Sequence, residues 1–100
     1  MWDAKPGLEP AQALRYWRNE HAALVRQVPG LRRYVQNHCV DDPEGGGPPY
    51  TGLGEVWFDS VEDAQTAAST PEWAAVLDDA ATFMAMDRVV AAWAEEHSLV

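Results

Sequence analysis

A stretch rich in glycine and proline, residues 41–52 (DDPEGGGPPYTG), divides the chain into two halves. Glycine and proline favour turns and disfavour the interiors of helices and strands, so the stretch predicts a loop. The three glycines are not followed by the GK[ST] pattern of a phosphate-binding loop. A helix and then a strand are expected before this loop, and a strand and then a helix after it.

The first helix is expected to begin at Glu9 and Pro10 and to end at the Pro-Gly pair at 29–30. Proline suits the first turn of a helix, and glycine commonly follows its last turn. The predicted buried stripe has four apolar members at helical spacing: Leu14, Trp17, Leu24 and Val28. His21 takes the place in this stripe between Trp17 and Leu24, which makes it the main candidate for a functional side chain.

Residues 31–40 and 53–59 are expected to be strands, and a second helical region begins at Ser60 and begins again at Thr70. Ser60 and Thr70 are typical capping residues, and Pro71 suits the first turn of the second segment. Residues 89–100 are expected to close the sheet as a strand, and residues 1–5 form at most a short first strand. The order predicts one ferredoxin-like α+β domain, βαββαβ, over residues 1–100.

Charge and composition limit the partners of the chain. It carries a net charge of -9, with 16 acidic and 7 basic residues, which disfavours nucleic acid and anionic membrane surfaces. No stretch approaches the roughly 20 apolar residues that a membrane span requires. Cys39 is the single cysteine, so no internal disulfide forms, and we expect a cytoplasmic protein.

Several segments in the same order resemble the EthD family. They are KPGL at 5–8, Tyr16 and Trp17 with His21, PGLRRYV at 29–35, GEVWFDS at 54–60, PE at 71–72, Phe83, DR at 87–88 and EEH at 95–97. The resemblance covers nearly the whole chain. It implies a ferredoxin-like monomer whose sheet packs against that of a second copy to form a dimeric α/β barrel, and hence a homodimer.

The same resemblance implies a class of chemistry. Relatives include isomerases of muconolactones and dehydratases or cyclases of aromatic polyketide routes, none of which uses a cofactor. The helix histidine of the family falls on His21, and the strand tyrosine that assists it in the lactone isomerase falls on Tyr34. We therefore expect acid–base catalysis by His21, with Tyr34 on the developing oxyanion of a small aromatic, polyketide-type or lactone substrate.

Five further residues are expected to bind the substrate: Trp17, Gln36, His38, Trp57 and Phe83. Tyr34, Gln36 and His38 alternate along one strand, so they share a face. If that face meets the first helix, these residues converge with His21. Aromatic side chains suit the walls of a pocket for a flat ligand, and equally suit plain core packing.

Other readings stay open at this stage. The histidines, His21, His38 and His97, lack the spacing of a metal site, and no flavin or nicotinamide motif is present, so we expect no cofactor. Some proteins of the same barrel fold bind haem through a helix histidine, so a haem-dependent or cofactor-free monooxygenase is one alternative. A non-catalytic accessory protein that binds a small molecule is another. The sequence assigns no role to Cys39.

Overall fold

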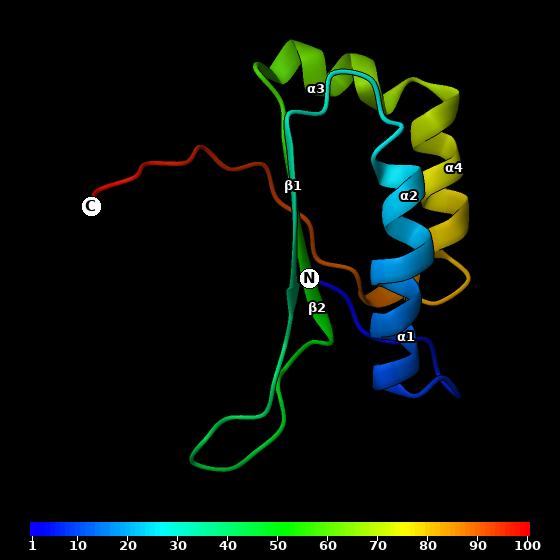
Figure 1. The fold of residues 1–100 in the computed structure, drawn as a ribbon, viewed down its shortest axis with the longest axis vertical. Helices are drawn as coiled ribbons and strands as arrows, with labels where there is room; N and C mark the ends of the chain where they lie inside the picture. Colours follow the sequence, from blue (N-terminus) through cyan, green and yellow to red (C-terminus); the bar gives the residue numbers. More distant parts are fainter.

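The computed structural model describes residues 1–100, and Figure 1 shows its layers. The elements in chain order are α1 (Pro10–Tyr16), the π-helical turn η1 (Trp17–His21), α2 (Ala22–Val25), β1 (Arg33–His38), β2 (Gly52–Trp57), α3 (Val61–Ala68), α4 (Pro71–Ala80) and the 3₁₀ turn η2 (Met86–Arg88). In Figure 1, α1, α2 and α4 lie on one side of the β1–β2 hairpin, and no helix covers its other side. No helix is both long and apolar enough to cross a membrane.

The predicted first helix is present but is interrupted by a turn of different geometry. Pro10 occupies its first turn, as expected. Over η1 the backbone N–H of Ala22 donates to the carbonyl of Trp17, five residues earlier instead of the four of an α-helix, which widens the helix at this turn. Trp17 and His21, at the two ends of η1, are both buried. The predicted stripe is therefore confirmed at these positions.

The two central strands form an antiparallel pair in which Tyr34 lies opposite Val56 and His38 lies opposite Gly52. Successive side chains of a strand point to opposite faces. Tyr34, Gln36 and His38 face the helices, because the Gln36 side chain reaches the carbonyl of Trp17. The other face carries Arg33 and Trp57, with the guanidinium of Arg33 4.5 Å from the centre of the Trp57 ring.

The N-terminal residues extend this hairpin as a short first strand. Trp2 pairs antiparallel with Gly52, and Ala4 pairs antiparallel with Met84. The backbone N–H of Lys5 donates to the carbonyl of Phe83, and that of Ala85 donates to the carbonyl of Asp3, both at 2.9 Å. Residues 2–4 thus lie between β2 and residues 83–85. This is the order of a split βαβ fold, and the prediction of a short first strand is confirmed.

The predicted closing strand over residues 89–100 is wrong. The segment that pairs with the N-terminus lies earlier, at residues 83–85, and beyond it only Val90 exchanges hydrogen bonds with Met1. All residues from 89 onward are exposed, and Figure 1 shows this segment running away from the helices. The place beside the N-terminal strand is already taken by residues 83–85, so residues 89–100 have no free strand edge there with which to pair.

Two apolar clusters hold the helices to the sheet. One contains Trp2, Ala13, Trp17 and Phe83. The other contains Val25, Val28, Ala67 and Val76. The caps expected from the sequence are also present: Ser60 Oγ accepts from the backbone N–H of Asp63 at 3.0 Å, and Thr70 Oγ1 accepts from that of Trp73 at 3.3 Å. These caps satisfy N–H groups that the helices α3 and α4 leave unpaired at their starts.

Candidate functional site

His21 is the last residue of the π-helical turn η1, and its side chain faces α4. In a regular α-helix, residues five apart stand about 140° apart around the axis, so Tyr16 and His21 would diverge. The wider turn of η1, which follows Tyr16 directly, reduces this divergence. Both side chains consequently reach one residue of α4, Asp79.

Asp79 binds both side chains, one with each carboxylate oxygen. His21 Nδ1 lies 2.8 Å from Oδ2, and the hydroxyl of Tyr16 donates to Oδ1 at 2.5 Å. The His21 side chain is 3% exposed and that of Asp79 17%, so little water competes for these bonds. The hydrogen bond to Asp79, with some burial, raises the pKa of Tyr16, which keeps this phenol a donor.

This arrangement fixes which nitrogen of His21 is available. A carboxylate only accepts hydrogen bonds, so Nδ1 carries the proton and Nε2 of the neutral ring carries a lone pair. Nε2 makes no hydrogen bond within the chain. Nε2 nevertheless keeps some access to solvent. The only fully buried side-chain polar atoms without a partner are Trp2 Nε1 and one oxygen of Glu72, and Nε2 is not among them. The edge of the Phe83 ring packs against the imidazole, with ring centres 5.0 Å apart.

A row of polar side chains on β1 faces the helices. Gln36 Nε2 donates to the hydroxyl of Tyr34 at 2.7 Å and to the carbonyl of Trp17 at 2.9 Å. Gln36 Oε1 lies 3.0 Å from Nε2 of His38. The Tyr34 oxygen already accepts a hydrogen bond, so its own proton is free to be donated to a ligand. Gln36 therefore connects the row to the turn that carries His21.

Burial affects the titration of both ends of this row. It raises the pKa of Tyr34, although the hydrogen bond from Gln36 and the charge of Arg26 act in the other direction. It also lowers the pKa of His38, and the nearby charge of Arg18 lowers it further. The His38 ring lies against that of Trp17, with centres 5.1 Å apart and planes inclined at 34°. Both groups are thus neutral near pH 7.

The predicted site residues fall into two groups with one exception. His21 contacts Phe83, whereas Tyr34, Gln36 and His38 form the row that Trp17 covers. The strand face does meet the first helix, as expected, but it meets Trp17. His21 turns towards α4 and shares no hydrogen bond or ring contact with Tyr34. Trp57 is the exception, because it lies on the opposite face of the sheet under Arg33.

Two residues of this site, Asp79 and Tyr16, were not predicted from the sequence to have a role. Asp79 comes three residues after Val76 and directly before Ala80, both of which are buried. A carboxylate on the edge of a buried stripe requires a hydrogen-bond partner, so its position in α4 was a usable signal. For Tyr16 no signal existed, because a helix of regular periodicity turns it away from His21.

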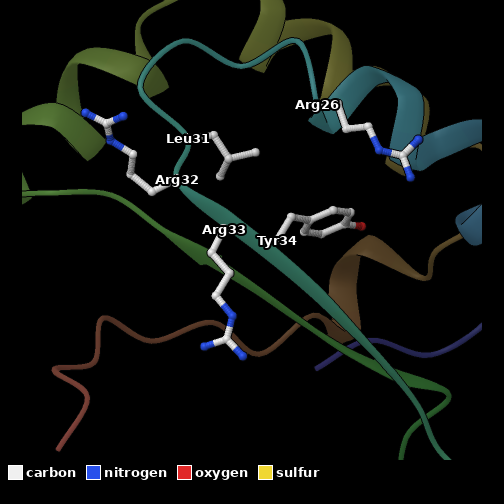
Figure 2. A pocket seen from close by; sticks show the side chains of 5 residues that line it. All are labelled: Arg26, Leu31, Arg32, Arg33 and Tyr34. Atoms are coloured by element: carbon white, nitrogen blue, oxygen red, sulfur yellow. The ribbon is translucent and has the colours of Figure 1, made fainter.

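An open pocket of about 340 Å³ lies beyond the Tyr34 end of the row. It is lined by Arg26, Leu31, Arg32, Arg33 and Tyr34. Figure 2 shows that the side chains of Leu31 and Tyr34 point to the side on which Arg26 lies, whereas those of Arg32 and Arg33 point away from it.

The remaining candidates lie apart from these groups. His97 is exposed and lies 3.7 Å from Glu95. Cys39 is a free, half-buried thiol. Nowhere in the chain do three or more histidine, cysteine, aspartate or glutamate side chains gather in a group able to hold a metal ion.

Together, the fold and this site define a small α+β domain of split βαβ order, with a buried histidine held by a carboxylate between its helices. The family model of the EthD domain matches residues 5–87, and the chain belongs to this family. The resemblance seen in the sequence is thereby confirmed, and so is the α+β fold class.

Two relatives extend this comparison. A crystal structure of an ethyl tert-butyl ether D (EthD) family protein from Bacillus halodurans C-125 superposes with a TM-score of 0.72 at 28% identity, covering 85% of this chain and 83% of that one. An uncharacterized 11.0 kDa protein in the thcB-thcC intergenic region of Rhodococcus erythropolis is 29% identical over 75 residues, which are 75% of this chain and 72% of its own.

Proposed function

We propose that the chain is a cofactor-independent acid–base enzyme, an isomerase or a dehydratase/cyclase, that acts on a small aromatic, polyketide-type or lactone substrate. The observation that carries the proposal is the state of His21. Its Nδ1 is bound to Asp79, its Nε2 is unpaired, and its buried ring packs against Phe83. An imidazole held in this way is suited to accept a proton at Nε2 and to return it.

The proposed reaction begins with the removal of a proton from a carbon next to a carbonyl. Nε2 takes the proton, and the electron pair of the C–H bond moves towards the carbonyl oxygen to form an enolate. Asp79 stabilises the imidazolium that results, without itself taking the proton. Return of the proton to another carbon of the conjugated system completes an isomerisation; its transfer to a leaving hydroxide releases water and completes a dehydration.

The oxygen on which charge develops requires a hydrogen-bond donor. In this proposal Tyr34 supplies it, since its hydroxyl has a free proton and lies in a row that Gln36 ties to the turn bearing His21. Trp17, Gln36, His38 and Phe83 would contact the substrate around these two residues. For Trp57, which lies on the other face of the sheet, we propose a place at a homodimer interface instead. The free Cys39 is compatible with work in the reducing cytoplasm.

The test measures proton exchange on a simple lactone. α-Angelica lactone has an acidic C–H next to its carbonyl and isomerises by a proton shift alone, so NMR in D₂O follows both deuterium uptake and isomerisation. We expect the wild-type protein to accelerate both, His21→Ala to reduce the rate at least ~100-fold, and Tyr34→Phe to reduce it less. Asp79→Asn should also slow the reaction.

The matched control is Asp78→Asn, which changes an exposed carboxylate one position away in α4 and should leave the rate unchanged. Full activity in folded His21→Ala would contradict the proposal. Absence of exchange on a panel of lactones and β-ketoesters, together with binding of added haem that His21→Ala abolishes, would favour the haem-dependent alternative. Binding of these compounds without exchange would favour an accessory protein.

A further inference from the structure

The pocket beyond Tyr34 gathers positive charge in an acidic protein. Three of the chain's seven basic residues line it, although the net charge is -9. Two of the three are already engaged. Arg32 binds Asp59 through Nε at 2.9 Å and Nη2 at 2.8 Å, and Arg33 lies over the Trp57 ring.

Arg26 is the arginine of this pocket that has no partner. It forms neither an ion pair nor a side-chain hydrogen bond, unlike Arg32, and it sits just past the end of α2. Its charge is felt at the Tyr34 hydroxyl, where it lowers the pKa against the larger effect of burial. A free guanidinium and a phenol with a free proton therefore face the same space.

The rest of this space is apolar. Leu31 and the ring of Tyr34 provide a wall beside the two donors, and Figure 2 shows both side chains directed to the Arg26 side. The volume of about 340 Å³ is in the range of small-molecule sites. A guanidinium prefers a carboxylate, to which it can donate two parallel hydrogen bonds, and the wall suits a ring.

We propose that this pocket binds the carboxylate of a small aromatic or cyclic acid, with the carboxylate on Arg26 and Tyr34 and the ring against Leu31. Where the acid is the substrate of His21, the inference rests on the proposed function and names the substrate class as an organic anion. The single proton of Tyr34 then goes to the developing oxyanion, and Arg26 alone holds the carboxylate. Binding of the acid does not require turnover by His21, so the binding inference and the proposed function can fail separately.

The experiment compares benzoate with benzamide, which has the same shape and no charge. Each is titrated into ¹⁵N-labelled protein, and the backbone amide shifts report affinity and location. We expect benzoate to bind at least about tenfold more tightly than benzamide and to shift residues 26 and 31–34. Arg26→Ala should remove this preference, and Tyr34→Phe should reduce it.

Arg15→Ala is the matched control, because Arg15 is an exposed arginine of α1 that does not line the pocket. It should bind benzoate like the wild type. Arg26→Gln, which keeps most of the side-chain stem, replaces Arg26→Ala if the latter is less well folded. Equal affinity for benzoate and benzamide, or benzoate binding that both Arg26 variants leave unchanged, would overturn the inference. Inorganic phosphate that binds as tightly at the same amides would overturn the aromatic acid as ligand.

Discussion

At the scale of single residues, the position of Trp17 depends on two glycines of β2. A Cβ atom at Gly52 would stand 2.8 Å from Cζ3 of Trp17 and 2.7 Å from Nε1 of Trp2, and one at Gly54 would stand 3.2 Å from Cζ2 of Trp17. The absence of side chains at these positions lets the indole of Trp17 lie flat enough to cover the polar row on β1.

The first prediction concerns the stability of alanine variants at these glycines. Gly52→Ala should lower the free energy of unfolding by about 1–3 kcal/mol, because two packed indoles must move, and Gly54→Ala should lower it by less. Gly47→Ala is the control, since its nearest neighbour would be 4.0 Å away, and it should stay within about 0.5 kcal/mol. Urea unfolding measures all three. A Gly52→Ala variant as stable as Gly47→Ala would show that Trp17 does not pack here.

Single residues also show what the sequence could and could not predict about the site. His21 interrupts an apolar stripe, so its burial and its need for a partner follow from the pattern alone. The identity of the partner does not, because Asp79 lies 58 positions further along the chain. Only the packing of α4 beside η1 brings them together. The face of Trp57 follows once the register of the hairpin is known. Tyr34 lies opposite Val56, and Trp57, the next residue of β2, must point to the other face.

At the scale of elements, η1 lies over β1, and Arg18 of the π turn approaches His38 of the strand. The charge of Arg18 acts with burial to lower the pKa of His38. In the unfolded chain that pKa returns to about 6.5. The unfolded state therefore takes up the proton first as the pH falls, and the contribution of His38 to stability decreases below about pH 6.5.

The second prediction tests this contact by titration. Arg18→Ala should raise the pKa of His38 and lessen the loss of stability below pH 6.5, because one of its two causes is removed. The His38 ring signals in NMR report the pKa directly. Arg15→Ala, one turn earlier in α1, should leave it unchanged. An unaltered His38 titration in Arg18→Ala would mean that η1 and β1 are arranged differently.

Elements were also predictable to different degrees. Both helices and both central strands follow from periodicity, and Ser60, Thr70 and Pro71 mark helix starts by local chemistry that does not depend on the rest of the fold. The π turn does not follow, since nothing in the sequence at 17–21 distinguishes it from a regular turn. The closing strand was placed too late because pairing with residues 2–4, and not β propensity, decides which segment joins the sheet.

At the scale of the whole molecule, one face of the sheet has no helix over it (Figure 1). This face carries Trp57 with Arg33 above it, and the segment that follows the last helix exposes Val90 at 52% and Trp93 at 72%. Apolar surface of this kind is commonly covered by a partner, and the length of the chain limits the core it can form alone.

The third prediction is that the chain forms a homodimer through this face. Multi-angle light scattering at micromolar concentration should give twice the 11.1 kDa of one chain. Trp57→Glu should give a monomer, because it buries a charge in the interface. Leu77→Glu, at an exposed apolar position of α4, should remain a dimer. A wild-type protein that is a stable monomer in solution would contradict the dimeric α/β barrel that the family resemblance implies.

The gathering of arginines at one pocket also affects how an anion arrives from solution. Far from the surface, a molecule of net charge -9 repels an incoming anion, whereas within the pocket the guanidinium of Arg26 attracts it. At physiological ionic strength charges are screened beyond about 8 Å, so the repulsion fades while the short-range attraction persists. The association rate of an anionic ligand should therefore be lower at low ionic strength than at moderate ionic strength. The bound complex should nevertheless be weaker at moderate ionic strength.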